Sequence, residues 1–236
     1  MGKPICGDNA PITHHASSTM SRIVALLLAA FLALTAAAQA PFPELESRAA
    51  ALKALEDADA RFRLAGVVYF GRSGIAADGP LLVKRLSDES PVVRDIAGQA
   101  VWLVWSRSGD EEADRLLESG IAEMNARRYP RAIEIFSEVI TRRPDFAEGW
   151  NKRATAYYLA GEMRKSLADC DEVMKRNPQH FGALSGYGQI YARLEQYENA
   201  IEYFRRALAV NPNLTDLENV IRGLEELVRE RRRRSI

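Results

Sequence analysis

The chain has 236 residues, of which 47% are hydrophobic and 8% aromatic, so it holds enough apolar material for one or two folded domains. This composition excludes a wholly disordered chain. The 32 basic and 32 acidic residues balance, which excludes a global electrostatic field that would attract nucleic acid or an anionic membrane.

Residues 20–38 have the pattern of a secretory signal peptide. A start of Met-Ser-Arg is followed by an apolar stretch over 23–34 and then by small residues. Cleavage after Ala38 suits this pattern better than cleavage after Ala40, which would leave a proline beside the cut. A membrane anchor is the alternative, but the apolar stretch is shorter than the roughly 20 residues of a spanning helix. We therefore expect a periplasmic or secreted protein that has no stable membrane insertion once the signal is cleaved.

Residues 1–19 are polar and do not suit the region in front of a signal peptide. The simplest interpretation is that the protein starts at Met20 and that residues 1–19 are a non-native or disordered extension. Cys6 is then absent from the exported protein, and the remaining Cys170 has no partner for an internal disulfide. We expect the fold to be stabilised by packing.

Residues 41–112 contain a weak repetition. A Leu-x-Asp sequence, followed by an Arg at the same distance, occurs from Leu55 to Arg63 and again from Leu86 to Arg94. Short aspartate turns and Ala/Gly-rich second helices resemble HEAT-type helical repeats, joined by a glycine-rich loop over 71–79. The alternative is an irregular helical cap on the segment that follows. Either version extends a helical solenoid.

Region 113–214 is a tandem repeat of three copies of equal length, at 113–146, 147–180 and 181–214. Small, aromatic and proline residues recur at equivalent places in these copies. The residues are Gly120, Ala132, Phe136, Pro144, Trp150, Ala154, Tyr157, Pro178, Gly188, Tyr191, Ala200, Phe204 and Pro212. Their period and types resemble the tetratricopeptide repeat family. The resemblance implies two antiparallel helices in each copy, with small residues where the helices cross and a helix end before each proline.

The middle copy departs from the family pattern. Arg153, Ser166 and Cys170 stand where the family usually has a leucine, an alanine and a large aromatic residue. We expect this copy to bury less volume than its neighbours and to be the weakest layer of the array. A reactive thiol is the alternative role for Cys170, but its place in the repeat is a packing position, which favours a buried and inert side chain.

Residues 215–236 are predicted to form a helix that caps the last copy. Thr215 and Glu218 suit a capping box, and apolar residues over 217–228 recur at helical spacing on one side. The arginines over 229–234 either contact an anionic surface or complement the dipole at the helix C-terminus, and we favour the second interpretation. The expected fold is all-α, a right-handed α-solenoid of helix-turn-helix repeats with a C-terminal capping helix.

The sequence offers no recognisable catalytic or cofactor-binding pattern. The glycines near residue 71 lack the Lys-Ser/Thr of a phosphate-binding loop, and the exported chain keeps one histidine and one cysteine, too few for a zinc site. A Ser-His-Asp triad would need His180, which we expect to be an exposed imidazole in a turn between copies. We therefore expect a protein that is not an enzyme and that binds no metal or cofactor.

The family resemblance implies a concave groove lined by the first helix of each copy. Its partner-binding residues would be Leu117, Glu118, Ile121, Asn125, Asn151, Lys152, Thr155, Tyr158, Gln189 and Arg193. Such a groove suits a helix or an extended peptide, so the expected partner is a protein or peptide and not nucleic acid. The expected function is an exported interaction scaffold or adaptor. A structural or envelope-assembly role of residues 41–112 is the alternative, and an enzyme on a helical scaffold is the third hypothesis.

Some members of the family hold the C-terminal carboxylate of chaperones with a clamp of Lys, Asn and Arg side chains in this groove. The equivalent places here hold Leu117, Ile121, Lys152, Gly182 and Gly186. The clamp is therefore absent, and a chaperone C-terminus is not the ligand that the sequence predicts.

Overall fold

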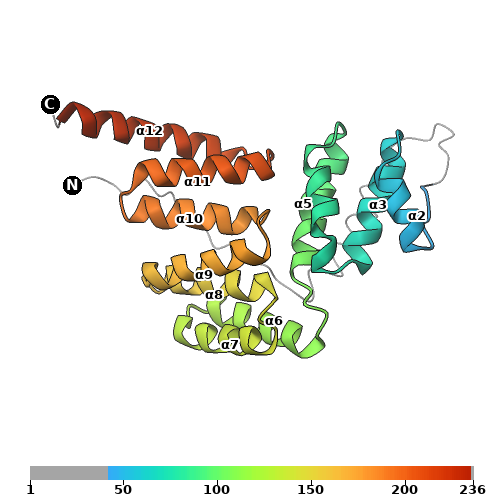
Figure 1. Ribbon diagram of the computed structural model, residues 1–236, viewed down its shortest axis with the longest axis horizontal. Coiled ribbons are helices and arrows are strands. Elements are labelled where there is room, and N and C mark those ends of the chain that lie inside the picture. The colour runs from blue at the N-terminus through green and yellow to red at the C-terminus, as the bar shows by residue number, and fades with distance from the viewer. Residues whose placement is uncertain (1–41, 235–236) are drawn as a thin grey trace.

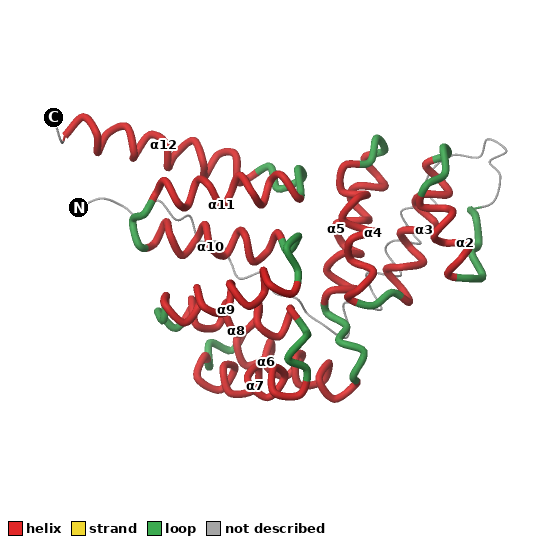
Figure 2. The backbone as a smooth tube through the Cα atoms, in the orientation of Figure 1, coloured by secondary structure: helices red, strands yellow, loops and turns green. Residues whose placement is uncertain are grey.

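Figure 1 shows the computed structural model of the protein, which describes residues 42–234. Within this range every regular element is a helix, as Figure 2 shows, and the all-α solenoid predicted from the sequence is confirmed. The predicted signal peptide at 20–38 and the predicted extension at 1–19 lie outside the described residues. None of the helices in the described range combines the length and the apolar character needed to span a bilayer.

Four α-helices and two short 3-10 turns form the N-terminal module, residues 42–108. The helices are α2 (Arg48–Leu55), α3 (Ala60–Ser73), α4 (Gly79–Val83) and α5 (Pro91–Trp105), and the turns are η1 (Ala76–Asp78) and η2 (Lys84–Ser87). Ser47 and Asp59 cap α2 and α3 by accepting a backbone N–H of the first turn, and a proline at the first position starts α5. These local signals fix where the helices of the module begin.

The two halves of the N-terminal module repeat one arrangement of aspartate and arginine. Arg63 donates hydrogen bonds to two carbonyl oxygens of the turn that begins at Asp57, and Arg94 does the same at the turn that begins at Asp88. Arg63 also forms a bidentate ion pair with the buried Asp88, with both contacts at 2.8 Å. The weak repetition in the sequence is therefore also a repetition in space, and the ion pair joins its two halves.

The glycine-rich loop of this module is shorter than predicted. Gly71 lies inside α3 and Gly79 is the first residue of α4, so only Gly74 belongs to the connection between them. A Cβ atom on Gly71 would lie 3.2 Å from Ala100, and one on Gly79 would overlap the indole of Trp105. Both glycines thus serve close packing against α5, and this non-local cause gave the sequence the appearance of a longer loop.

Six helices form three antiparallel pairs, and a seventh covers the last pair. The pairs are α6 (Glu111–Asn125) with α7 (Tyr129–Arg142), α8 (Ala147–Leu159) with α9 (Met163–Arg176), and α10 (Phe181–Arg193) with α11 (Tyr197–Val210); the last helix is α12 (Asp216–Arg234). The second helix of each pair ends two residues before a proline, because proline disfavours helix in the residue that precedes it. Figure 1 shows the pairs stacked in chain order, and we call them the repeat array.

A glycine on the first helix faces an aromatic ring on the second helix in two of the pairs. A Cβ atom on Gly120 would overlap the ring of Phe136, and one on Gly188 would lie 2.5 Å from the ring of Phe204. Both phenylalanines are buried. The two helices of a pair can therefore approach closely only because the first carries no side chain at the crossing point.

The middle pair has the same contact with different residues. Ala154 and Cys170 take the places of the glycine and the phenylalanine, and both are buried in one cluster. Arg153 forms two hydrogen bonds of 2.8 Å with Asp169, and Ser166 donates one of 2.7 Å to the carbonyl oxygen of Ala154. Cys170 fills less volume than the phenylalanines of the other pairs. The alanine on the first helix and the polar contacts offset part of this loss of packing. Whether this is the weakest layer of the array stays a prediction.

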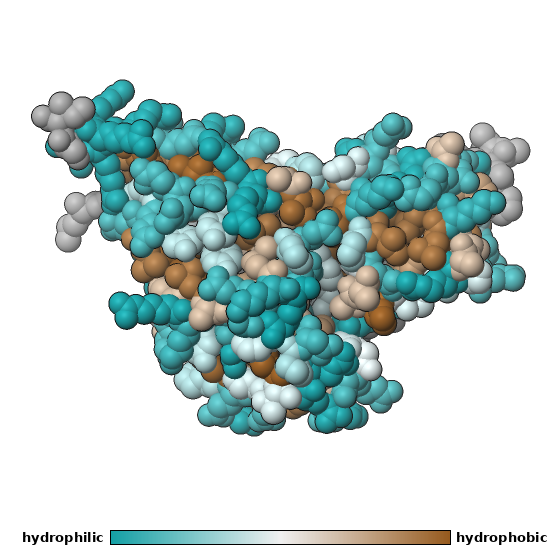
Figure 3. All heavy atoms as spheres, in the orientation of Figure 1, coloured by the Kyte–Doolittle hydropathy of each residue, from teal (hydrophilic) through white to brown (hydrophobic). Residues whose placement is uncertain are grey.

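The N-terminal module and the repeat array share one hydrophobic core. The cluster that contains the buried residues of α2 to α5 also contains Phe181, Leu184 and Ala207 of the third pair. Asn213, which follows α11, donates a hydrogen bond of 2.8 Å to the carbonyl oxygen of Leu86. In Figure 1, α5 stands across the ends of α10 and α11, and Figure 3 shows hydrophobic side chains gathered at this junction. The module is therefore packed onto the array.

The last helix covers the third pair, as the sequence predicts. Ile221, Leu224 and Val228 of α12 are buried in a cluster with residues of α11. Arg231 bonds both the carboxylate and the carbonyl oxygen of Glu195, and its guanidinium lies 4.4 Å from the ring centroid of Tyr197. These contacts favour a structural role for the basic end of the helix.

Candidate functional site

A small hollow lies between α8, α9 and α10. It has a volume of about 40 Å³, enough for one small side chain. The lining residues are Asn151, Ala154, Thr155, Tyr158, Ser166, Cys170, Gly182, Gly186, Gln189 and Ile190. None of them carries a charge, and four of them are groove residues predicted from the sequence. The structure thus brings together four of the six residues predicted in the second and third copies, and Lys152 and Arg193 are not among the lining residues.

The polar groups at the base of the hollow are largely engaged by the protein itself. The hydroxyl of Ser166 donates to the carbonyl oxygen of Ala154, and the hydroxyl of Thr155 donates to the carbonyl oxygen of Asn151 at 3.0 Å. Asn151 Nδ2 donates to Glu148 Oε2 at 3.0 Å. Because a carboxylate only accepts, this bond fixes the orientation of the Asn151 amide. Its Oδ1 has no hydrogen-bond partner among the residues that the structure describes.

An aromatic ring and a guanidinium border the open side of the hollow. The guanidinium of Arg193 lies 5.5 Å from the ring centroid of Tyr158, within the range of a cation–π contact. Gln189 is exposed beside them. On α6, Glu118 and Asn125 are exposed and Ile121 is half-buried, so this helix adds a polar and partly acidic part to the groove.

Leu117 is not part of this surface. Its side chain is only 2% exposed and packs in a core cluster with Phe136 and Val139. The structure therefore places Leu117 in the core of the first pair instead of in the groove. The family resemblance placed Leu117 in the groove and did not show that α7 covers this position.

His180, which we expected to be exposed, is completely buried. Its ring stacks on that of Trp105, with the two centroids 4.4 Å apart. Its Nδ1 accepts the N–H of Ala183 in the first turn of α10, so Nε2 carries the hydrogen and donates to Glu148 at 3.0 Å. The prediction was wrong because the covering indole comes from α5, far away in the sequence.

Glu148 is a buried carboxylate with three partners. Besides His180 and Asn151, it pairs with Lys152 Nζ at 2.9 Å. Burial alone would raise the pKa of Glu148, but the Lys152 ammonium and the hydrogen bond from His180 outweigh burial and lower the pKa to about 2. The carboxylate is therefore ionised at neutral pH.

Helix α5 covers the part of the groove nearest the N-termini of α8 and α10. Trp102 packs against Gly182, where a Cβ atom would lie 2.5 Å from the indole, and Lys152 Nζ lies 5.8 Å from the centroid of the same ring system. The remaining part of α8, residues 153–159, is roughly 10 Å long at about 1.5 Å per residue. An extended peptide fits this width more readily than a helix, whose diameter with side chains is about 10–12 Å.

Sequence reasoning missed the tryptophans that cover the groove. Two of the three tryptophans of the chain, Trp102 and Trp105, lie one helical turn apart. On one helix this spacing puts both indoles on the same face, and so much apolar area needs a partner surface. The spacing of the two tryptophans therefore predicts a buried face on this helix, but the sequence does not show which part of the chain covers that face.

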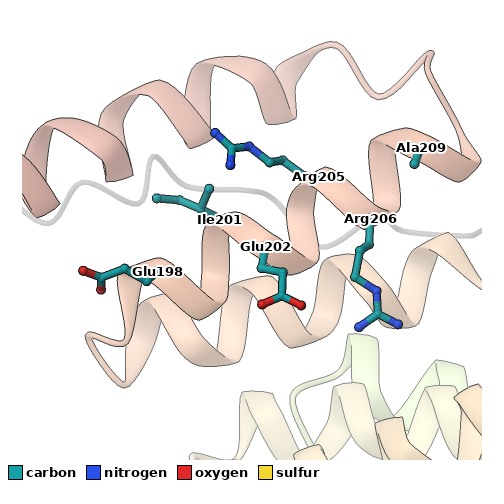
Figure 4. A pocket seen from close by; sticks show the side chains of 6 residues that line it. All are labelled: Glu198, Ile201, Glu202, Arg205, Arg206 and Ala209. Carbon is teal, nitrogen blue, oxygen red and sulfur yellow. The ribbon is translucent and has the colours of Figure 1, made fainter.

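A second, shallow depression lies on α11, which is a second helix of a pair and not a groove helix (Figure 4). Its volume is about 480 Å³, and its lining residues are Glu198, Ile201, Glu202, Arg205, Arg206 and Ala209. Arg205 pairs with Glu225 of α12 at 2.7 Å. Acidic and basic side chains are mixed here, which is typical of a solvated helix face.

Comparisons with known proteins identify the repeats. Two family models described as tetratricopeptide repeat match residues 117–174 and 183–214. A TPR repeat-containing protein of Rhizobium etli is 34% identical over 110 residues, which cover 47% of this chain and 54% of the relative. The Hsp70-Hsp90 organizing protein of Triticum aestivum is 26% identical over 157 residues, which cover 66% of this chain and 26% of that protein. Among solved structures, the Sgt2 TPR domain from Aspergillus fumigatus is 21% identical and matches with a TM-score of 0.50, over 52% of this chain and 83% of that chain.

The repeating sequence pattern, the stacked helix pairs and these matches agree, and the helix pairs of residues 113–214 are tetratricopeptide repeats. It spans about half the length of the Rhizobium etli relative and about a quarter of the Triticum aestivum protein. The family models match residues within the repeat array, and the part of the chain before residue 113 is described by its own contacts.

Proposed function

We propose that the protein is an adaptor that holds a peptide segment of a partner protein in the open part of the groove. The observation that carries this proposal is the uncharged hollow bordered by Tyr158 and Arg193. Tyrosine and arginine are residue types that contribute much of the binding energy in protein interfaces. An uncharged hollow beside them suits a peptide with one small anchor side chain and polar neighbours.

The proposed partner differs from a chaperone C-terminus. Several relatives are named Hsp70-Hsp90 organizing proteins. In this chain two of the places that would hold a terminal carboxylate are Gly182 and Gly186, and Gly182 is covered by Trp102. The groove therefore supplies no cationic clamp there, and the proposed ligand is an internal segment of a partner.

Binding, rather than catalysis, is the role that the described side chains support. Within residues 42–234 no group of three or more His, Cys, Asp or Glu side chains could hold a metal ion. Burial, with smaller effects of Asp169 and Asp171, raises the pKa of the Cys170 thiol to about 12. A protonated thiol is a poor nucleophile, so Cys170 suits packing at the base of the hollow.

A pair of charge reversals tests the groove. Arg193→Glu removes the cation beside Tyr158, whereas Arg206→Glu makes the same change beside Tyr203 on α11, outside the groove. Neither arginine is buried, so both variants should fold. We expect affinity purification followed by quantitative mass spectrometry to recover the partner about tenfold less with Arg193→Glu and unchanged with Arg206→Glu. Equal recovery with the two variants would contradict binding in the groove.

Export is a second part of the proposal, and the signal pattern over 20–38 supports it. Cell fractionation and N-terminal sequencing of the processed protein should find it outside the cytoplasm with Gln39 as its first residue. Replacing Leu26 and Leu27 by arginine should leave the chain unprocessed in the cytoplasm. An unaltered chain that stays unprocessed in the cytoplasm would rule out export.

A further inference from the structure

The N-terminal module reaches the hollow through a row of buried contacts. Trp105 of α5 stacks on His180, His180 Nε2 donates to Glu148, and Glu148 accepts from Asn151 Nδ2. Because His180 Nδ1 is occupied by the N–H of Ala183, only Nε2 is left to face the carboxylate. The last member of the row, Asn151, lines the hollow.

We infer that the N-terminal module is part of the binding site, and that it holds Asn151 with its Oδ1 ready to accept a backbone N–H of an extended, uncharged peptide segment. This inference rests on the proposed adaptor function and names the ligand more closely. Asn151 would contact the peptide directly. Glu148, His180 and Trp105 would be positioning residues, since they act through Asn151.

The geometry of the groove favours an extended segment. In a helix the backbone N–H groups are already paired within the helix, whereas an extended segment presents unpaired N–H groups to an acceptor. The part of the groove that α5 leaves open is also narrow for a helix with its side chains. The absence of charged residues from the lining of the hollow suits a segment that is uncharged at this point.

The floor of the hollow has room for one small side chain of that segment. A Cβ atom on Gly186 would meet only Cys170 Sγ, at 3.7 Å, which is ordinary van der Waals contact. The space above Gly186 is therefore open, in contrast to the space at Gly182, which Trp102 fills. We expect an alanine, serine or valine of the ligand beside the N–H that Asn151 accepts.

A fixed acceptor is a stronger recognition group than a mobile one. A free asparagine side chain has to be ordered when a ligand binds, and this ordering weakens binding. The bond to Glu148 has already ordered Asn151, and Glu148 is itself held by Lys152 and by His180. The packing of the N-terminal module on the repeat array therefore affects the affinity for the peptide.

The probe for the test is a phage-displayed library of short random peptides, selected on the whole exported chain. Peptides that bind the unaltered protein and not Arg193→Glu are groove ligands. The strongest of them is then synthesised with single backbone N-methyl groups, each of which removes one N–H. We expect one N-methyl position to weaken binding to the unaltered protein by about tenfold, the usual effect of one lost hydrogen bond. The same N-methyl group should make no difference to Asn151→Ala, which already binds about tenfold more weakly.

His180→Asn tests the positioning role. Asparagine can still cap α10, but it is too short to reach Glu148. We expect this variant to fold, to bind the parent peptide about tenfold more weakly, and to lose its sensitivity to the same N-methyl group. Combined with Asn151→Ala it should cause no further loss of affinity, because both changes remove one interaction. Gln189→Ala is the matched control: it removes another amide of the hollow and should keep the N-methyl effect.

The possible results separate the two proposals. If the library yields no peptide that depends on Arg193, the adaptor function in the groove is overturned. If such peptides bind but one N-methyl group weakens their binding to the unaltered protein and to Asn151→Ala equally, the inference about Asn151 is wrong and the adaptor function stands. If every N-methyl position abolishes binding, the ligand is helical, and the inference about an extended segment is likewise wrong.

Discussion

Glu148 is a buried, ionised side chain, and groups from two successive repeats compensate its charge. An isolated buried carboxylate costs several kcal/mol, and only charge and hydrogen bonding of good geometry offset this cost. Lys152 and Asn151 lie on the same helix as Glu148, whereas His180 precedes the helix of the next pair. The contacts therefore work as a set, since loss of any one of them leaves a less compensated charge in the core.

We expect Glu148 to stabilise the fold above about pH 4.5 and to lose this effect as the pH falls toward 2. A carboxyl group whose pKa is lower in the folded than in the unfolded chain binds fewer protons when folded, so acid favours unfolding. A pKa lowered from 4.5 to about 2 corresponds to about 3 kcal/mol at neutral pH. Denaturant unfolding at pH 7, 4 and 2.5 should show that the unaltered protein exceeds Glu148→Gln most at pH 7 and least at pH 2.5. A constant difference across these pH values would refute this assignment.

At the scale of the helices, the repeats were predictable because their determinants are local. The prolines that end the second helices and the glycines at the crossings act on residues within one copy of the repeat, so the sequence pattern carries their effect directly. The same reasoning was incomplete for the middle pair. It counted the side-chain volume lost at Cys170 but not the volume gained at Ala154. It also missed the ion pair between Arg153 and Asp169, which can be recognised only from the positions of the side chains.

Two glycine substitutions in helices should have opposite effects. Gly120→Ala makes a methyl group overlap the buried ring of Phe136, and we expect it to destabilise the protein by about 1–3 kcal/mol. Gly223→Ala in α12 meets no atom within 4 Å, and we expect it to stabilise the protein by up to about 1 kcal/mol through helix propensity. Thermal unfolding of the two variants measures both effects. A Gly120→Ala variant as stable as the unaltered protein, or more stable, would mean that the crossing of α6 and α7 is not tight.

At the scale of the whole molecule, the sequence did not predict where the N-terminal module lies. Helix periodicity reveals an apolar face but not its partner, and here the partner of α5 is the third helix pair. The error at His180 has this cause, whereas the error in the extent of the glycine-rich loop comes from the packing of Gly71 and Gly79 against α5 within the module. Asn151, Thr155, Tyr158 and Gln189, four of the six groove residues predicted in the second and third copies, line the hollow, and placing them needed only the repeat register.

Gly182 and Gly186 offer a matched test of this junction. Gly182→Ala places a methyl group against Trp102, and we expect it to destabilise the protein by about 1–3 kcal/mol and to expose the connection at residues 106–110 to protease. Gly186→Ala has room on the same helix, one turn away, and should leave both stability and proteolysis nearly unchanged. Denaturant unfolding and limited proteolysis measure the two effects. Equal behaviour of the variants would show that Trp102 does not hold the module in place.

The junction also fixes how many repeats the protein can have. An open solenoid can gain or lose units during evolution, because each unit contacts only its neighbours. In this protein the indole of Trp105 packs on the imidazole of His180 just before α10, and the carbonyl oxygen of Leu86 accepts from the amide of Asn213 just after α11. If one repeat were inserted between the N-terminal module and α10, or if one were removed there, a different helix pair would lie against α5. The contacts of the N-terminal helices therefore fix the number of repeats that precede α10. Duplication of one of those repeats would break these contacts.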